Sequence, residues 1–202
     1  MKKTLLIFMA LAMSFFVIAQ EKTKQKEVGL LFNDFDNFGL TFKTGTNNSL
    51  WRLNSLIISG NSQDEISDSS EYSQNRLGCS FKLGKEYRKA INENLELRYG
   101  ADISFSYNQY EYDRNDKTVS DNDRYIKQIE YEPGINLVFG FNYLINNKII
   151  LGAELLPSFS YMFGTETDKG YYNDDKTIKS DISGFRYGLS NTSAYLSLAY
   201  RF

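Results

Sequence analysis

Glu96, Asp102 and Glu154 are the side chains of this 202-residue chain that could support acid–base chemistry. Two carboxylates in one site can raise the pKa of one of them, which is the basis of carboxylate-pair catalysis. The sequence contains no histidine, so Ser–His and Asp–His catalysis is excluded. The competing interpretation is structural, because arginines in similar segments would neutralise the carboxylates in a packed interior. We favour this interpretation and predict no catalytic residue and no enzyme activity.

Acidic side chains also gather in three long polar segments, residues 61–72, 113–124 and 165–181. Clustered carboxylates are typical of Ca²⁺ sites. These segments lack the spacing of an EF-hand loop, and lysine and arginine are interspersed among the carboxylates. We therefore expect solvated acidic loops, with no metal ion and no cofactor.

The segments that carry the candidate residues alternate apolar and polar side chains with the two-residue period of a β-strand. The clearest is LELRYGADISFSYN, residues 95–108, in which every odd position is apolar or aromatic. Helical periodicity is absent from the chain after the first 20 residues. In all, eight strands are expected, at residues 28–33, 38–45, 51–59, 76–84, 95–108, 131–143, 151–164 and 192–202.

The expected connections alternate between short and long along the chain, which in a meander places the long ones at one end. Residues 84–94 form one of the modest connections, and the three acidic segments are the long ones. The hairpin around residues 146–148 needs a three-residue turn, because only this length sets Tyr143 against Leu151 on one face. Pro133 and Pro157 predict bulges or strand exits, since proline has no N–H to donate.

The polar faces of these strands carry six cations and four carboxylates, interspersed with Gly, Ser and Asn. If the polar faces line the interior of a barrel, the small residues leave room for an ion-pair network. The apolar faces would then contact lipid. The reverse arrangement, a lipocalin-like barrel with an apolar interior, has the same period. The predicted structural network consists of Lys43, Arg52, Arg76, Lys82, Glu96, Arg98, Asp102, Glu132, Glu154 and Arg201.

The first 19 residues have a basic start followed by an apolar stretch and the small residue Ala19, as in a cleaved secretory signal peptide. Residues 20–202 are then expected to form one domain. Without Lys2 and Lys3 the net charge falls from −2 to −4, which makes nucleic acid an improbable partner. Cys79 is the only cysteine, so no internal disulfide can form.

The C-terminal sequence YLSLAYRF, together with the signal peptide and the alternating segments, resembles the OmpA/OmpX-type family of small outer-membrane β-barrels. This resemblance implies that Tyr200 and Phe202 belong to a signal read by the barrel-assembly machinery. It also implies that the last strand pairs with the first, that both termini are periplasmic, and that the acidic loops are extracellular.

The sequence therefore predicts an all-β protein, an eight-stranded antiparallel up-and-down transmembrane β-barrel, located in the outer membrane as a monomer in contact with lipid. Its predicted role is structural or surface-interacting, with a lumen filled by side chains and an extracellular partner bound by the acidic loops. The alternatives are a periplasmic lipocalin-like carrier of a small apolar ligand and a very narrow pore.

Overall fold

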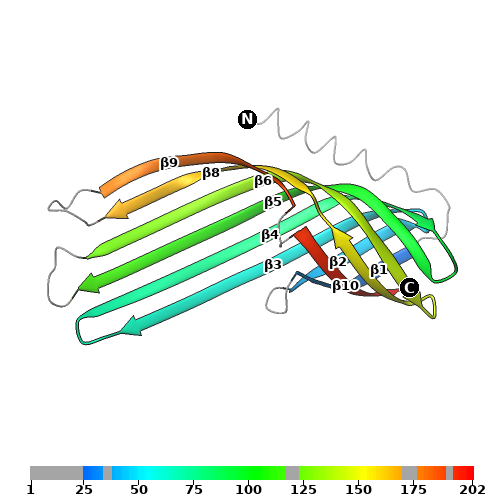
Figure 1. The fold of residues 1–202 in the computed structure, drawn as a ribbon, viewed down its shortest axis with the longest axis horizontal. Coiled ribbons are helices and arrows are strands. Elements are labelled where there is room, and N and C mark those ends of the chain that lie inside the picture. Colours follow the sequence, from blue (N-terminus) through cyan, green and yellow to red (C-terminus); the bar gives the residue numbers. More distant parts are fainter. Residues whose placement is uncertain (1–24, 34–37, 117–122, 170–176, 190–192) are drawn as a thin grey trace, which may run out of the picture.

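The computed structural model describes residues 25–33, 38–116, 123–169, 177–189 and 193–202. The predicted signal peptide lies outside these residues. The described residues form ten strands of one antiparallel sheet (Figure 1). The strands are β1 (Gln25–Phe32), β2 (Phe38–Thr46), β3 (Ser49–Ile66), β4 (Ser70–Ala90), β5 (Leu95–Asp116), β6 (Arg124–Ile145), β7 (Ile149–Leu155), β8 (Ser158–Lys169), β9 (Thr177–Gly188) and β10 (Ala194–Arg201).

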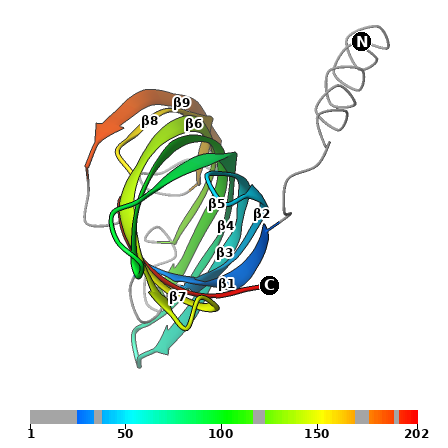
Figure 2. The same cartoon turned by 90° about the vertical axis from the view of Figure 1, so that its right-hand side faces the viewer.

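The sheet closes on itself as a barrel. Neighbouring strands follow the order β5-β4-β3-β2-β1-β10-β7-β6, and β6 pairs again with β5, which completes a ring (Figure 2). The first and last strands pair antiparallel, with Val28 opposite Tyr200 and Leu30 opposite Leu198. This confirms the all-β antiparallel barrel and the pairing of its two terminal strands.

The count of eight strands is not confirmed, because the expected strand 151–164 is divided into two and a further strand, β9, lies outside the eight predicted ranges. β7 and β8 both pair with the same edge of β6 and are separated by Leu156 and Pro157. β10, which corresponds to the last expected strand, pairs with β7, whereas the additional strand β9 pairs with β8. Proline explains the break between β7 and β8, since Pro157 has no N–H to donate to the ladder. Its carbonyl oxygen still accepts a hydrogen bond from the Leu137 N–H at 2.9 Å.

The barrel has two parts, which differ in how its wall closes. We call the closed part the ring: β1, β2, β7 and β10 with residues 49–55, 81–90, 95–105 and 137–145. Beyond it lies the outer extension: residues 57–66, 70–80, 106–116 and 124–136 with β8 and β9. Six strands make up the outer extension, and β3 and β9 form its two edges in the described part of the sheet (Figure 1).

The apolar faces point outward and the charged faces inward. Ile103, Leu137 and Phe139 on the outer surface are 60%, 48% and 52% exposed, whereas Arg52 and Glu86 on the inner surface are 0% exposed. An outer surface of this kind is typical of a barrel that contacts lipid. The inner surface does not fit the lipocalin-like alternative, whose interior must be apolar.

Strand limits differ from the predicted ones at both ends of the barrel. The described parts of the acidic segments predicted as loops are largely strand, since β3, β4, β5, β6, β8 and β9 extend into 61–72, 113–124 and 165–181. At the opposite end β4 continues to Ala90, so the predicted connection 84–94 shrinks to residues 91–94. Hydrogen bonding with a neighbouring strand holds these ends, although their side chains no longer alternate in polarity.

The three-residue turn between β6 and β7 is confirmed. Tyr143 lies opposite Leu151, and Ile145 opposite Ile149. Asn146 and Asn147 have φ angles of 52° and 56°, in the left-handed region that asparagine tolerates best among residues with a side chain.

Within the described residues, no helix combines the length and the apolar character that crossing a membrane requires.

Candidate functional site

Arg52 of β3 lies at the centre of a buried ionic cluster inside the ring. Its two terminal nitrogens donate to both carboxylate oxygens of Glu154 at 3.0 Å, which is the bidentate geometry favoured by guanidinium groups. Nη1 also donates to Glu86 at 3.1 Å, and Nε lies 3.2 Å from Asp102. One side chain therefore connects β3 with β4, β5 and β7 across the lumen.

Three further cations contact the same carboxylates. Arg98 Nη2 lies 2.9 Å from Glu154 Oε2, and Lys43 Nζ donates to Glu86 Oε2 at 2.8 Å. Arg88 donates to Glu86 at 2.7 Å. Because Glu86 has several cationic neighbours, removing any single one of them leaves this carboxylate paired.

Glu27 and Arg201 extend the cluster to the strands that close the barrel. Arg88 holds both oxygens of Glu27, at 2.6 and 2.7 Å. Arg201 of the last strand donates to Glu27 of the first strand at 2.9 Å and to Glu96 of β5 at 3.1 Å. The seam between β1 and β10 is thus supported by ion pairs inside the lumen as well as by its ladder.

The cluster is balanced in charge. It contains five cations, Lys43, Arg52, Arg88, Arg98 and Arg201, and five carboxylates, Glu27, Glu86, Glu96, Asp102 and Glu154. The exposed fraction of their side chains does not exceed 16%. Charges removed from water in this way are stable only when paired, and removing one partner leaves a costly unpaired charge.

A small apolar layer lies beside the ionic cluster on the inner face. Leu31, Val138, Leu156 and Tyr195 pack together and are at most 8% exposed. Lys82 donates to the Tyr195 hydroxyl at 2.9 Å and lies 4.5 Å from the centre of its ring. Lys82 therefore belongs to this layer.

The structure brings seven of the ten predicted network residues together, namely Lys43, Arg52, Glu96, Arg98, Asp102, Glu154 and Arg201. Lys82 lies in the apolar layer, and Arg76 and Glu132 lie in the outer extension. Sequence reasoning missed Glu27, Glu86 and Arg88. The predicted first strand begins at Val28, one residue after Glu27, and the predicted fourth strand ends at Gly84, two and four residues before Glu86 and Arg88. Glu86 and Arg88 keep the two-residue spacing of the polar face, but Lys85 and Lys89 on the opposite face hide this signal.

The three carboxylates considered for acid–base chemistry are not arranged as an isolated pair. Asp102 faces Arg52, Glu154 is shared by Arg52 and Arg98, and Glu96 contacts Arg201. Among the described residues, no three carboxylate or cysteine side chains converge in a way that could hold a metal ion. The cluster is therefore a set of ion pairs in which each considered carboxylate has a cationic partner.

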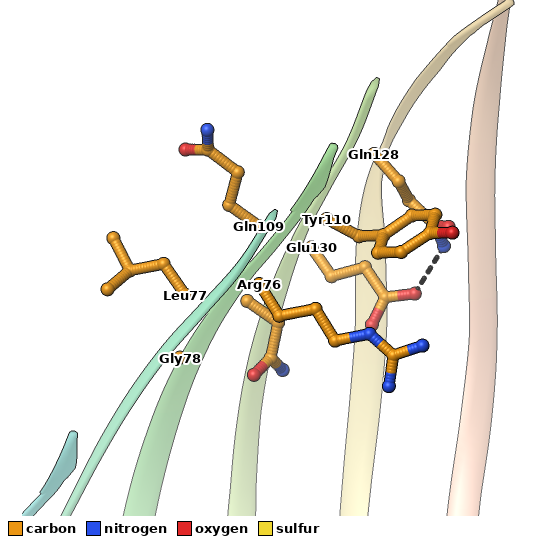
Figure 3. A pocket seen from close by; sticks show the side chains of 8 residues that line it. Arg76, Leu77, Gly78, Gln109, Tyr110, Gln128 and Glu130 are labelled. Carbon is orange, nitrogen blue, oxygen red and sulfur yellow. Dashed lines mark hydrogen bonds between the residues drawn. The ribbon is translucent and has the colours of Figure 1, made fainter. Parts of the chain in front are cut away.

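A hollow of about 350 Å³ lies in the outer extension (Figure 3). It is lined by Arg76, Leu77, Gly78, Asn108, Gln109, Tyr110, Gln128 and Glu130, from three adjacent strands. Arg76, Tyr110, Gln128 and Glu130 lie on one side of the sheet, whereas the side chains of Leu77 and Gln109 lie on the other (Figure 3). The hollow is open and is lined by both polar and apolar groups, in contrast to the packed ring.

Further out, polar pairs are exposed or partly exposed to solvent. Arg124 Nη2 lies 2.9 Å from Asp168 Oδ2, and the arginine side chain is 43% exposed. Tyr125 donates its hydroxyl proton to Glu111, and this hydrogen bond raises the pKa of Tyr125 to about 12. Such pairs contribute little to stability, because water competes for them.

A family model described as "Putative OmpA-OmpF-like porin family" matches residues 62–172, more than half of the chain. No curated protein sequence gives a significant match.

Several solved structures of distant sequence are similar to this chain. A major outer membrane protein from Thermus thermophilus is 14% identical, with 90% of this chain and 100% of that chain covered and a TM-score of 0.49. CarO of Acinetobacter baumannii is 13% identical, with 89% and 95% covered and a TM-score of 0.36. The attachment invasion locus protein Ail of Yersinia pestis is 14% identical, with 89% and 97% covered and a TM-score of 0.30.

Proposed function

This chain belongs to the OmpA-OmpF-like porin family, and from that premise we propose that it is an outer-membrane barrel whose ring is closed to solutes and whose outer extension binds at the cell surface. The protein is located in the outer membrane. The role is non-enzymatic and needs no cofactor. The single observation that carries the proposal is Arg52, which is 0% exposed while it contacts carboxylates from three other strands.

Two layers would block passage through the ring. A guanidinium that bridges the lumen to Glu154 occupies the space through which an ion would have to pass. The apolar layer around Val138 and Tyr195 adds a second obstacle, since hydrated ions avoid a narrow apolar constriction. The family name favours the alternative, a narrow pore, and ion conductance separates the two.

The test is single-channel recording of the purified protein in planar bilayers. We expect no stable conductance from the native barrel, and open events once the cluster is weakened by E86Q combined with E154Q. E132Q is the matched control, because Glu132 pairs with Arg186 in the outer extension, away from the ring. Steady porin-like conductance by the native protein would overturn the closed ring and establish a pore.

Assembly and lipid contact complete the proposal. Tyr200 and Phe202 are 46% and 61% exposed on the outer face of the last strand, and their rings stack at 6.3 Å. They are therefore accessible to the barrel-assembly machinery, as the resemblance implies. We propose that F202A slows insertion in cells while leaving the folded barrel stable, which pulse-labelling and gel mobility without boiling would measure. Unchanged insertion would remove Phe202 from the signal.

The acidic segments remain the proposed surface for an extracellular partner of the monomer. In the structure residues 61–66, 70–72, 113–116, 165–169 and 177–181 of these segments are strand, so the surface they offer is a sheet more than a set of loops. Its inner face carries tyrosines, amides and paired charges, which suits a polar ligand better than an apolar one.

A further inference from the structure

The hollow of the outer extension is built from two rows of side chains that cross the same three strands. Gly78 of β4 lies opposite Asn108 of β5, which lies opposite Glu130 of β6. In the next row Arg76 lies opposite Tyr110, and Tyr110 lies opposite Gln128. Glycine begins the first row, so Asn108 has no side chain opposite it on β4, which leaves room for the hollow.

The polar groups of the hollow are held in place by contacts among themselves. Gln128 donates to Glu130 Oε1 at 2.7 Å (Figure 3). The guanidinium of Arg76 lies 5.3 Å from the centre of the Tyr110 ring. Because these side chains already contact one another, they lose less conformational entropy when a ligand forms hydrogen bonds with them.

The charges of the hollow are close to balanced. Arg76 contributes a cation, and Glu130 contributes a carboxylate whose Oε2 lies 3.6 Å from Arg186. Arg186 also donates to Glu132 at 2.8 Å, so Glu130 and Glu132 share one arginine. The net charge of Arg76, Arg186, Glu130 and Glu132 is zero, which favours a neutral ligand over a phosphate or another strong anion.

The chemistry of the lining excludes several ligand classes. A protein partner needs an apolar or aromatic anchor at the centre of its interface. Here the aromatic ring, that of Tyr110, is already covered in part by Arg76. An acyl chain would need an apolar lining, whereas Asn108, Gln128 and Glu130 are polar. A ligand rich in hydroxyl groups fits best, because amides, a guanidinium and a carboxylate supply both donors and acceptors.

We propose that this hollow binds a neutral carbohydrate, one or two sugar residues in size, from outside the cell. The volume of about 350 Å³ lies near the lower end of the range of roughly 300–1,000 Å³ found for small-molecule sites. Arg76 and Glu130 form charge-assisted hydrogen bonds with adjacent hydroxyls, and Asn108 and Gln128 supply donors and acceptors around them. This proposal rests on the surface-binding role proposed above and names its ligand class.

The experiment measures saccharide binding to the full-length barrel in detergent by saturation-transfer NMR and calorimetry. The probes are maltose, lactose and chitobiose, with glucuronate as a charged comparison. Two variants test the hollow: G78V fills it, and N108L removes an amide. The matched control is N115L, which loses the same amide group from the exposed Asn115 of the same strand, outside the lining of the hollow.

We expect a neutral disaccharide to bind the native protein, at least a tenfold loss of affinity in both G78V and N108L, and no change of affinity in N115L. Gel mobility without boiling verifies that each variant is folded. If G78V does not fold, the affinity of N108L alone tests the hollow. Binding of glucuronate alone, no saccharide binding, or equal binding by all variants would overturn the proposal. Tighter binding to immobilised polysaccharide than to the free sugar would identify a surface glycan as the source of the ligand. Equal binding to the two would identify a free sugar as the ligand.

Failure here is distinguishable from failure of the closed ring, because conductance reports on the ring and saccharide binding reports on the outer extension. A barrel that conducts ions and still binds maltose loses only the closed ring. A barrel that is closed and binds no saccharide retains its ring and loses the assigned ligand.

Discussion

The ring and the outer extension share four strands, yet their inner faces differ. In the ring Arg52 and Arg98 are at most 1% exposed, and both contact Glu154 of β7, which lies across the lumen from Arg52. In the outer extension the side chains of Arg124 and Arg186 are 43% and 52% exposed. The carboxylate partner of Arg124 lies on the neighbouring strand β8, and those of Arg186 lie on β6, on the far side of β8 in the same sheet. The period-two pattern makes both inner faces polar, and closure of the wall decides which becomes packed.

Charged side chains therefore have different roles in the two parts of the barrel: they are buried in ion pairs in the ring and exposed to water in the outer extension. In a closed ring opposed side chains meet and neutralise one another, and the cost of desolvation makes each pairing necessary. Where β1 and β2 have ended, the same strands present polar groups to water, which keeps them available to a ligand. Equivalent substitutions should therefore affect the two parts of the barrel differently.

The largest effect is expected from R52M. This substitution leaves Glu86, Asp102 and Glu154 with one cation fewer in a site closed to water, and we expect a loss of about 3–5 kcal/mol in the free energy of unfolding. Denaturant titration in lipid vesicles, followed by the heat-modifiable gel band, measures it. The comparison is R124M, which breaks the exposed pair with Asp168 and should cost less than about 1 kcal/mol. Similar losses in the two variants would contradict the distinction.

Glycine substitutions give the next largest contrast. A Cβ added at Gly84 in the ring would clash with the carbonyl oxygen of Ala101 and the carboxylate of Asp102, so G84A should destabilise by about 1–3 kcal/mol. At Gly60 in the outer extension the nearest atom would be 3.8 Å away, so G60A should be neutral or stabilise by up to about 1 kcal/mol. The same titration measures both, and a costly G60A would show that the extension is packed.

The sequence predicts the faces of the strands better than their ends. Alternation placed Arg52, Arg98 and Glu154 on one polar face, and the structure brings them together. It failed where polarity stops alternating, because strand pairing depends on backbone hydrogen bonds and continues past Gly84 to Ala90. For that reason the sequence pattern places Arg88 in a connection, whereas the structure places it in β4.

The periodicity of the sequence cannot predict which side chains form ion pairs across the lumen. Arg52 and Glu154 are 102 residues apart in sequence. Their meeting depends on the stagger of all the strands between them, which the sequence pattern of one strand does not contain. The hollow was missed for a related reason, since it requires Gly78 and Asn108 to be in register.

Hydrogen exchange should separate the two parts without any substitution. In the described sheet β9 pairs only with β8, so alternate amides of residues 177–188 face its free edge. Residues 97–103 of β5 pair on both sides, with β4 and β6. We expect peptides from 177–188 to exchange well before those from 97–103 when the protein is held in lipid nanodiscs. Equal protection would indicate that a further segment pairs with β9.

The smallest effect concerns a proton and leaves stability almost unchanged. Tyr125 donates to the Glu111 carboxylate, and ionisation of the phenol would break this hydrogen bond and place a second negative charge beside Glu111 and close to Asp113. The pKa of Tyr125 is therefore raised to about 12. We expect E111Q to lower it towards the usual value of about 10. The measurement is phenolate absorbance during a pH titration, after subtraction of the Y125F curve.

The midpoint of denaturant unfolding at neutral pH should not change in E111Q, since Tyr125 is neutral there in both proteins and its contact is open to water. A shifted midpoint would mean that this outer pair is as important to the fold as the ion pairs of the ring. An unshifted pKa of Tyr125 in E111Q would mean that water, and not the Tyr125 hydroxyl, donates a hydrogen bond to the Glu111 carboxylate. Either result would weaken the distinction between an inner face that stabilises the barrel and one that remains free to bind.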